Sequence, residues 1–326
     1  MSFDLIAIGD PTVDTFLKIH EAHLALRVNP SQAELCIDYA DKIPVDDHYR
    51  YAAGGGVNVS TSVSRLGLKV AYYGVTGEDA EGESIRSALG REGVDISLMD
   101  RDSERGTNAS TALVFRGERT IFVWHQPRRY LLPALPVTGW IYLTSLGPPG
   151  PYVERLHAEV CRQVDSAGLG LAFNPGTHQL RMGAEALSDL LRRTRLLVVN
   201  RQEAMELSQA GNVSMLDLLK SLHRIGPRVV VITDGAAGSY AFDGNAFLKA
   251  GILETPVVDR TGAGDAYTSA VLTAHLLGRP LNEAMAWGSV QAAHVVQVYG
   301  ATPGLVRRHE LEAELALHPE LIGVAV

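Results

Sequence analysis

A glycine-rich segment near position 262 carries the clearest chemical signal in the sequence. The segment 258–267 follows a short extended run and opens an apolar stretch that predicts a helix. Gly262 and Gly264 permit a tight backbone turn, and the N–H groups of the helix start then point at one spot, where the positive helix end favours an anion. Asp265 stands at the edge of this spot, and its charge suits the acceptor of a hydroxyl proton better than a ligand of phosphate. The alternative is that Asp265 only caps the helix and the glycines only form the turn.

Two other glycine-loop motifs are excluded by their spacing. A dinucleotide-binding fingerprint that begins at Gly262 requires a further glycine at position 267, which is Tyr267. A P-loop requires Gly-Lys followed by Ser or Thr, and the sequence contains no Gly-Lys pair. The anion site expected near position 262 is therefore of another kind.

A second glycine-rich segment, 53–60, also opens a predicted helix. Gly54, Gly55 and Gly56 let a ligand approach the backbone closely, and Asn58 offers both a donor and an acceptor. Because the segment contains no Lys or Arg, it suits neutral hydroxyl groups better than phosphate. The alternative is a glycine-rich helix start that packs against a strand.

Two carboxylates bracket the end of the first apolar run. Asp10 and Asp14 both follow it closely in the sequence. Ligands of open α/β sheets bind beyond the carboxyl ends of the strands, so Asp14 is well placed to hold sugar hydroxyls. For Asp10, which precedes Pro11, we expect a role as a surface cap or in a turn.

Two more segments follow the ends of predicted strands. Asn200 and Glu203 lie one helical turn apart, and their oxygens, with room for water, suit Mg²⁺ bound mainly through substrate phosphates. The segment from Thr233 to Gly238 would let a nucleotide lie close to the backbone. Each segment has a plain alternative, an ordinary helix start in the first case and a simple turn in the second.

Short β-rich apolar runs alternate with helical patterns along the chain. The runs are continuous rather than alternating, which is typical of strands covered on both faces of a parallel sheet. This rhythm predicts a doubly wound α/β fold, with no internal repeat and no break that marks a second domain. Strands are predicted at 5–9, 70–75, 140–146, 168–173, 196–200 and 228–233, and helices at 56–67, 79–92, 151–167, 201–225, 265–278 and 281–298.

Two excursions interrupt this rhythm. Residues 12–50 form a long mixed segment after the first strand, and residues 105–126 predict a hairpin that turns at 116–119. Segments of this length commonly form lids or binding loops. The alternative is a surface segment that has no function. A further hairpin is predicted at 239–250, where Asp-Gly-Asn forms the turn.

Composition limits the classes of function. With 46% hydrophobic residues the 326-residue chain can form a substantial core, and its formal net charge of −8 provides no cationic surface for nucleic acid or an anionic membrane. Cys36 and Cys161 form no C-x-x-C pair, which predicts a cytoplasmic protein rather than a disulfide scaffold or zinc site. No basic segment precedes Lys18, so we expect no signal peptide. The uncharged stretches 131–153 and 284–306 contain prolines or polar residues and predict buried segments rather than membrane spans.

Four of these segments occur together in a fixed order: Gly-Gly-x-x-Asn near 55, Asn-x-x-Glu near 200, Thr-x-Gly-x-x-Gly near 233 and Asp-x-x-Gly-Ala-Gly-Asp near 260. The set resembles the ribokinase-like carbohydrate kinases, also called the PfkB family. The resemblance extends over nearly the whole chain, from 9–14 to 299–303. It implies a doubly wound, mostly parallel sheet flanked by helices, one kinase domain over 1–326, and a small β lid formed by about 12–50 and 105–126.

The resemblance also implies roles for individual residues. Asp265 would be the base that takes the proton of the acceptor hydroxyl, and because the helix start favours its ionised form we expect a weak base. The anion hole over the transferred phosphoryl group would consist of Gly262, Ala263 and Gly264. The other implied residues are Asn200 and Glu203 for Mg²⁺ and its waters, Thr233, Gly235 and Gly238 for the nucleotide, Asp14, Gly55, Gly56 and Asn58 for the acceptor, and Asp259, Thr261 and Gly300 for the K⁺ that some members bind.

The implied reaction is the ATP-dependent phosphorylation of a hydroxyl or hydroxymethyl group of a free sugar, with Mg²⁺ as the metal. Gly56 and Val57 stand where phosphosugar kinases of the family often place Lys, which disfavours a phosphorylated acceptor. Ser289 stands near the adenine site, where the family often has Asn or His. In some members the lid also forms the contact of a homodimer.

Two other functions stay open at this point. A nucleoside kinase shares all four motifs, and Phe16, Phe122 or Trp124 would supply the wall that a base requires. A non-catalytic ligand-binding relative is the second alternative. The presence of Asp265 argues against it, because such a relative has no need of a base.

Overall fold

The computed structural model describes residues 2–20, 25–29, 32–36, 39–115, 118–211 and 213–326. Its largest element is a nine-stranded sheet with the strand order β17-β16-β15-β14-β13-β12-β11-β1-β6. Six neighbouring strands are parallel, and three antiparallel strands extend one edge. The parallel strands are β1 (Ser2–Ile8), β6 (Val70–Tyr73), β11 (Val137–Leu143), β12 (Gly170–Phe173), β13 (Leu196–Asn200) and β14 (Val229–Thr233), and the antiparallel ones are β15 (Ser239–Phe242), β16 (Phe247–Ala250) and β17 (Val324–Ala325).

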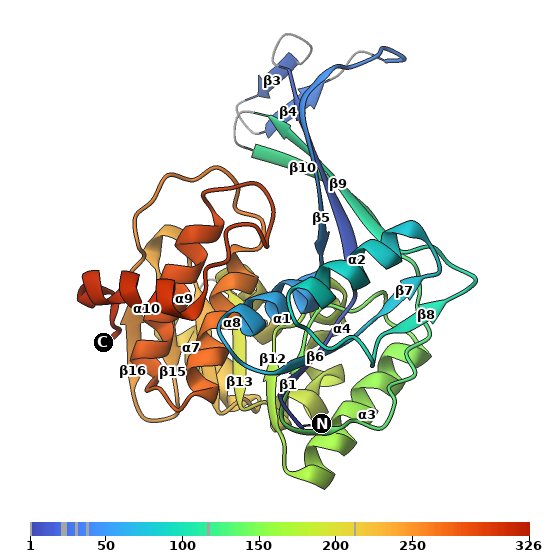
Figure 1. Ribbon diagram of the computed structural model, residues 1–326. Coiled ribbons are helices and arrows are strands. Elements are labelled where there is room, and N and C mark those ends of the chain that lie inside the picture. The colour runs from blue at the N-terminus through green and yellow to red at the C-terminus, as the bar shows by residue number, and fades with distance from the viewer. Residues whose placement is uncertain (1, 21–24, 30–31, 37–38, 116–117, 212) are drawn as a thin grey trace.

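Helices cover both faces of this central sheet, and we call the sheet with its helices the body (Figure 1). Leu5 and Ala7 of β1 face one apolar core, whereas Ile6 and Ile8 face the other, and all four are fully buried. Burial on both sides explains the continuous apolar runs of the sequence. The first layer contains α1 (Gly55–Arg65), α2 (Ala80–Arg91), α8 (Ala263–Leu276), α9 (Leu281–Val295) and α10 (Arg308–Leu317), and the second contains α3 (Pro151–Ala167), α4 (Thr177–Ala186), α5 (Ser188–Arg193), α6 (Arg201–Ser208) and α7 (Met215–Arg224).

Local sequence signals set the ends of these helices. The Asp79 side chain accepts a hydrogen bond from the Gly82 amide and caps α2, whose first turn also carries acidic residues that favour the positive helix end. Pro151 occupies the first position of α3, and Gly168 ends it in a left-handed conformation. These two helices therefore begin or end at residues that the sequence itself marks, namely a capping Asp, a Pro and a Gly.

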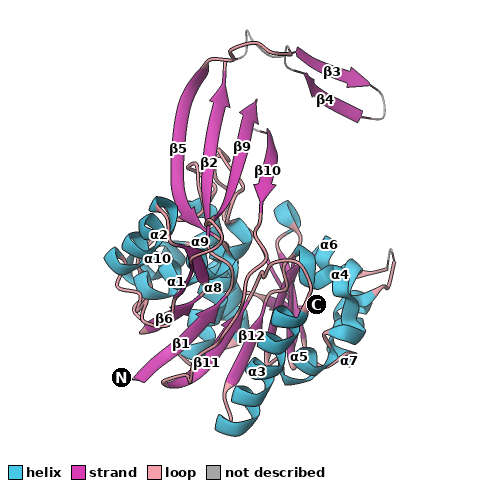
Figure 2. Cartoon of the chain, turned by 90° about the vertical axis from the view of Figure 1, so that its right-hand side faces the viewer, coloured by secondary structure: helices cyan, strands magenta, loops and turns pink. Residues whose placement is uncertain are grey.

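A second, smaller sheet stands away from the helical layers, and we call it the lid sheet. It has the order β10-β9-β2-β5, in which β2 and β9 are parallel and the other neighbours antiparallel. Figures 1 and 2 show it rising from the carboxyl ends of the body strands, with the β3–β4 hairpin beyond it. The strands outside the central sheet are β2 (Thr12–Ile19), β3 (Ala25–Asn29), β4 (Gln32–Cys36), β5 (Val45–Ala53), β7 (Val75–Gly77), β8 (Asp100–Asp102), β9 (Asn108–Phe115) and β10 (Glu118–Trp124).

Most elements agree with the sequence prediction. The six predicted strands are present, and the hairpins expected at 105–126 and 239–250 are β9–β10 and β15–β16, although residues 116 and 117 of the first turn lie outside the described part of the chain. The single helix predicted at 201–225 was wrong, because Gln209 and Gly211 adopt left-handed conformations that separate α6 from α7. Helices α4, α5 and α10 were not predicted.

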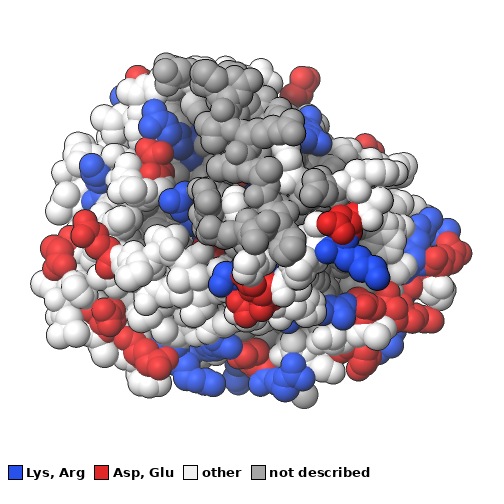
Figure 3. Space-filling model, turned by 90° about the horizontal axis from the view of Figure 1, so that it is seen from above, with Lys and Arg blue, Asp and Glu red and all other residues white. Residues whose placement is uncertain are grey.

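Two features of the structure concern binding to a membrane and to anions, namely the character of the helices and the distribution of surface charge. Among the described residues, no helix combines the length and the apolar character that crossing a membrane requires. On the face seen from the lid side, basic and acidic side chains lie in small mixed groups (Figure 3). An anion that approaches this face meets local groups rather than a broad positive field.

Candidate active site

The residues expected to bind the acceptor converge near the carboxyl end of β1. Gly55 and Asn58 belong to the first turn of α1, and Asp265 is the third residue of α8. Asn58 Nδ2 donates a hydrogen bond to Asp265 Oδ2 at 2.8 Å. Because the two residues are 207 positions apart, the packing of α1 against α8 creates this contact.

The second carboxylate oxygen of Asp265 lies close to Gly55. A Cβ atom at Gly55 would lie 3.3 Å from Asp265 Oδ1 and 2.9 Å from Thr144 Oγ1. The carboxylate and the hydroxyl are therefore neighbours across position 55. A larger residue at this position would collide with Thr144, so the close packing around Asp265 requires glycine here.

One buried polar atom beside Asp265, Asn58 Oδ1, has no hydrogen-bond partner within the described chain. Burial and the charge of Asp265 raise the pKa of Tyr142 well above its usual value, and a hydrogen bond between the buried hydroxyls of Tyr142 and Thr144 lowers it. Buried polar groups without partners are rare and call for a ligand or water. The sequence analysis missed Thr144 and Tyr142, because both are ordinary residues of a strand and its end, with no spacing that marks them.

Burial makes Asp265 a stronger base than the sequence suggested. It raises the pKa of Asp265, the Asn58 hydrogen bond lowers it, and the nearby charge of Asp14 raises it again. The positive end of α8 by itself favours the ionised carboxylate, and the expectation of a weak base rested on this effect alone. The net direction is upward, so the expectation of a weak base was wrong. A raised pKa improves a group that must accept a proton.

The start of α8 has the geometry of an anion site. Gly262 is the N-cap with a left-handed backbone (φ 78°), and a Cβ atom there would lie 2.2 Å from the Cβ of Ala301. Only glycine fits this position. The first N–H groups of the helix belong to Ala263, Gly264 and Asp265. The Ala263 amide donates to the Arg260 carbonyl at 3.3 Å in this structure, so it would have to exchange this acceptor for an anion. Since Gly262 rather than Asp265 is the N-cap, the alternative that Asp265 serves only as a cap does not hold.

Asp14, on strand β2 of the lid sheet, lies near enough to Asp265 for its charge to act on that carboxylate. Its Oδ1 accepts a hydrogen bond from the Ser110 hydroxyl of β9 at 2.7 Å. Burial raises the pKa of Asp14, the Ser110 hydroxyl lowers it, Asp259 raises it and Arg119 lowers it. Because the charge of Asp14 also raises the pKa of Asp265, the lid and body carboxylates lie within electrostatic reach of each other.

Asp10 has a structural role at the end of β1. It is 6% exposed, and the Tyr130 hydroxyl donates toward its two oxygens at 2.9 and 2.8 Å. The Gly147 amide in turn donates to the Tyr130 hydroxyl at 3.0 Å. Burial raises the pKa of Asp10 to about 7. The surface cap or turn role expected for Asp10 was therefore wrong, because its side chain is buried and accepts from Tyr130.

The three residues implied for K⁺ lie together around the Asp259 carboxylate. Its Oδ1 accepts hydrogen bonds from the Thr261 amide at 3.0 Å and the Thr261 hydroxyl at 2.8 Å, and its Oδ2 accepts one from the Gly300 amide at 3.1 Å. Arg119 of the lid sheet completes the set with an ion pair at 2.8 Å. Protein donors thus already use both oxygens of this carboxylate, and Arg119 supplies a positive charge. The implied K⁺ would instead be bound by backbone carbonyls near these residues, and its binding stays a prediction. No motif singled out Arg119 in the sequence.

Asn200 and Glu203 form a reciprocal cap at the start of α6. Asn200 Oδ1 accepts from the Glu203 amide and Glu203 Oε2 from the Asn200 amide, both at 2.9 Å. The ordinary helix-start role left open for this pair is therefore present. Burial raises the pKa of Glu203, and the charges that act on it, from Asp265 and Glu206, raise it further. A carboxylate in such surroundings fits Mg²⁺ held through water and phosphates.

The described residues contain no group of three or more His, Cys, Asp or Glu side chains arranged to hold a metal. Phosphate oxygens and water are common ligands of Mg²⁺.

The residues expected to bind the nucleotide lie between β14 and β15. Thr233 ends β14, and the Gly238 amide donates to the Gly235 carbonyl at 3.1 Å in the turn that follows. A Cβ atom at Gly238 would lie 2.1 Å from the last carbonyl of β16, so this packing requires glycine. Ser289, expected near adenine, is 6% exposed and donates to the Gly251 carbonyl at 2.7 Å. Its hydroxyl is thus used within the protein.

Aromatic rings line the side of the lid sheet that faces the body. Tyr299 of the body lies 5.2 Å from Tyr49 in a stacked pair and 6.5 Å from Phe16, between ring centroids. Phe16 is only 2% exposed. Phe122 and Trp124 are paired with positions 111 and 109, so the alternation of a strand places them on the opposite face. Of the three aromatic residues proposed as a wall for a base, only Phe16 faces the site.

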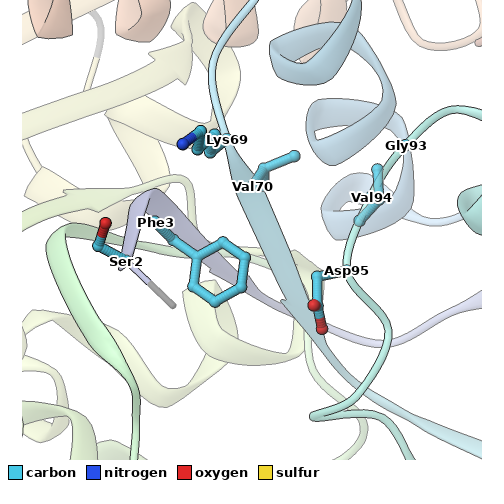
Figure 4. A pocket seen from close by; sticks show the side chains of 7 residues that line it. All are labelled: Ser2, Phe3, Lys69, Val70, Gly93, Val94 and Asp95. Atoms are coloured by element: carbon cyan, nitrogen blue, oxygen red, sulfur yellow. The ribbon is translucent and has the colours of Figure 1, made fainter.

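A cavity of about 600 Å³ lies at the other end of the body strands (Figure 4). Its lining comes from the beginnings of β1 and β6 and the loop after α2 and consists of Ser2, Phe3, Lys69, Val70, Gly93, Val94 and Asp95. The candidate residues described above lie beyond the opposite, carboxyl ends of these strands. The cavity is therefore separate from the candidate active site.

Comparison with known proteins agrees with this geometry. The family model for pfkB family carbohydrate kinases matches residues 26–307. A 5-dehydro-2-deoxygluconokinase of Shouchella clausii is 27% identical over 283 residues, 81% of this chain and 86% of that protein. A nucleoside kinase of Methanocaldococcus jannaschii is 21% identical over 287 residues, 85% of this chain and 89% of that protein. The solved structure of Arabidopsis thaliana ribokinase with ribose and ATP has a TM-score of 0.77 and 21% identity, covering 97% of this chain and 99% of that chain.

Proposed function

Because the chain belongs to the pfkB family of carbohydrate kinases, we propose that it transfers the γ-phosphoryl group of ATP to a hydroxyl or hydroxymethyl group of a free sugar. Membership of the family makes it an ATP-dependent sugar kinase. The proposal concerns which acceptor it phosphorylates. The observation that carries it is the buried Asp265 carboxylate at the start of α8, which Asn58 holds through one oxygen while the described residues supply no hydrogen-bond donor to the other. An acceptor hydroxyl within reach of that oxygen would meet its proton acceptor directly.

The proposed transfer relies on positioning and electrostatics. The acceptor oxygen bonds to the γ-phosphorus as the bond to the β,γ-bridging oxygen breaks, and ADP leaves with that oxygen. Asp265 takes the hydroxyl proton as the new bond forms. Negative charge on the equatorial phosphoryl oxygens is stabilised by the N–H groups from Gly262 to Gly264 at the positive end of α8.

The residues near the start of α6 fit a magnesium nucleotide. Mg²⁺ bound to the phosphates of ATP would neutralise part of their charge. The half-buried Glu203 would hold waters of the ion, and Asn200 fixes the carboxylate by the reciprocal cap. The turn from Thr233 to Gly238 is the proposed neighbour of the nucleotide.

The acceptor is proposed to lie between the lid sheet and the body. Asp14 of β2 and Asn58 of α1 would bind its hydroxyls from the two sides, with Gly55 and Gly56 allowing close approach to the backbone. Closure of the lid over the acceptor would exclude water and thus limit the hydrolysis of ATP.

The groups around Asp14 favour an uncharged sugar. Arg119, whose charge acts on Asp14, already forms a partly buried ion pair with Asp259, which leaves it less available to a phosphate. Phe16 is almost fully buried, and Phe122 and Trp124 lie on the far face of the lid sheet, so none of them offers an open wall to a base. A nucleoside is the second candidate, because the stacked pair of Tyr49 and Tyr299 borders the same side.

A panel of acceptors tests the proposal. Release of ADP would be followed with ATP, Mg²⁺ and one compound at a time from sugars, sugar acids, sugar phosphates and nucleosides, with Asp265→Asn as the inactive control. We expect turnover with an uncharged free sugar that Asp265→Asn abolishes. Turnover with a nucleoside alone would overturn the choice of acceptor. ADP release that is equal in wild type and Asp265→Asn would overturn the role of the carboxylate.

A further inference from the structure

One ion pair joins the lid sheet to the loop that leads into α8. Arg119 lies on the edge strand β10, and its Nη1 donates to Asp259 Oδ1 at 2.8 Å. The Asp259 side chain is 5% exposed and that of Arg119 is 30% exposed. The same carboxylate binds both the amide and the hydroxyl of Thr261 and the amide of Gly300. Asp259 therefore connects the lid sheet, the loop before α8 and the segment around residue 300.

The negative charge of Asp259 is balanced by a basic residue of the lid sheet. Among the described residues, Arg119 is its only partner in an ion pair. The other charged group nearby is Asp14, whose pKa Asp259 raises and Arg119 lowers, so the guanidinium serves a pair of carboxylates. If Arg119 is replaced while the lid sheet stays in place, the carboxylate of Asp259 loses its ion-pair partner in buried surroundings, which costs stability. Withdrawal of β10 would remove the same partner and also admit water to Asp259, so the surroundings of this carboxylate change with the position of the lid sheet.

The loop held by Asp259 forms the anion site. Gly262 packs so closely on Ala301 that a Cβ atom would lie 2.2 Å from the alanine Cβ. Asp259 binds both sides of this contact, through Thr261 on the loop and Gly300 on the neighbouring segment. A shift of its carboxylate would therefore move the backbone at Gly262, where the first N–H groups of α8 begin.

We propose that Arg119 is a positioning residue that couples the lid to the anion site. When the lid closes over the acceptor, the guanidinium fixes Asp259, and Asp259 fixes the start of α8. The anion site is complete only in the closed protein, which joins acceptor binding to phosphoryl transfer. This inference rests on the proposed function for its catalytic consequence, whereas the ion pair itself can be tested without turnover.

A second ion pair between the lid and the body provides a matched control. Arg50 of β5 contacts Glu81 of α2, and their side chains are 50% and 35% exposed. This pair also bridges the two parts of the protein but lies away from the loop before α8. Exposed pairs of this kind contribute little to stability. Arg50→Gln therefore removes a lid contact of the same chemical type without touching the anion site.

Unfolding without ligand tests the ion pair. Wild type, Arg119→Gln, Asp259→Asn, the double variant and Arg50→Gln would be melted side by side. We expect Arg119→Gln to lower the melting temperature by about 2–4 °C and Arg50→Gln to change it by less than about 1 °C. In the Asp259→Asn background, Arg119→Gln should cause almost no further loss, because no buried charge remains. Equal losses in both backgrounds would show that the pair does not hold Asp259.

Steady-state kinetics with the best acceptor then tests the coupling. Arg119→Gln should lower kcat about 10–100-fold with the KM for ATP nearly unchanged, as expected when a catalytic group is misplaced. Arg119→Lys should retain more of kcat, and Arg50→Gln should stay within about twofold of wild type. Losses from Arg119→Gln and Asp259→Asn that multiply in the double variant would mean that Arg119 acts on the substrate directly, and would overturn the proposal. If wild type transfers no phosphoryl group, the proposed function fails, and the melting experiment still decides on the ion pair.

Discussion

The body and the lid sheet are both built from short β-strands, but they bury their side chains to very different extents. Ile6, Leu197 and Val231 of the central sheet are fully buried. On the lid edge strand β10, by contrast, Phe122 and Val123 are each 60% exposed. Helices cover the body on both faces, whereas the lid sheet meets the body mainly on one side (Figure 2).

From this difference we expect the body to be rigid and the lid sheet to move more readily. The body buries large apolar cores on both faces of its sheet, and the cooperative loss of those contacts opposes local opening. The lid sheet is joined to the body by a few specific contacts, among them the Tyr49–Tyr299 stack and the Arg119–Asp259 pair. We infer that the body fixes the phosphoryl-transfer groups and that the lid adds acceptor binding to this frame.

The largest expected effect concerns the body. Asp265→Asn keeps the size of the side chain and can still contact Asn58, but it removes the proton acceptor. We expect kcat to fall about 10²–10⁴-fold with little change in either KM, since loss of a general base has this magnitude. Steady-state phosphorylation together with a thermal melt checks the result. A folded variant with more than about a tenth of the wild-type kcat would contradict the assignment.

The second-largest expected effect concerns acceptor binding, to which we propose that the lid sheet and the body both contribute. Asp14→Ala on the lid and Asn58→Ala on the body should each weaken acceptor binding about five- to 150-fold, because each removes a hydrogen bond worth about 1–3 kcal/mol in a buried site. Thr15→Ala, next to Asp14 but on the other face of β2, is the matched control. Calorimetry should find ATP affinity near wild type in all three. A loss confined to ATP would mean that the two ends of the site are reversed.

The difference between the two regions also explains what the sequence could predict. The six parallel strands were predictable because burial on both faces forces continuous apolar runs such as 196–199. Asp265 and Asn58 were predictable because glycine-rich helix starts are local patterns. Arg119 and Thr144 were not, since their importance arises from contacts between distant segments that no local spacing records. The pKa of Asp265 was misjudged for the same reason, because burial is a property of the assembled fold.

A smaller effect should appear in the pH dependence of stability. Burial raises the pKa of Asp10 from 3.8 to about 7, so between these values the folded protein binds more protons than the unfolded chain. The contribution of Asp10 to stability therefore falls as the pH rises through this window, by about 1.4 kcal/mol for each pH unit. Urea unfolding at pH 5 and pH 7 should show a steeper loss for wild type than for Asp10→Asn. Parallel pH profiles would contradict the buried state of this carboxylate.

The smallest effect is expected at the exposed edge of the lid. Phe122→Ser should change the free energy of unfolding by no more than about 0.5 kcal/mol, because an exposed side chain loses few contacts. The homodimer implied by the family resemblance would use this apolar edge strand. Sedimentation at several concentrations should then show weaker self-association for Phe122→Ser than for wild type. Identical sedimentation of the two proteins would exclude Phe122 from such a contact.

The central claim is that the body holds the phosphoryl-transfer groups and that the lid sheet binds the acceptor. Removing part of the lid sheet tests this claim most directly. In a variant without residues 112–124, the KM values for acceptor and ATP would be measured in parallel, with circular dichroism and a thermal melt to establish that the body is folded. We predict that the KM for the acceptor rises at least about tenfold, which corresponds to about 1.4 kcal/mol, while the KM for ATP stays close to wild type. Unchanged acceptor kinetics in the folded deletion variant would contradict the account.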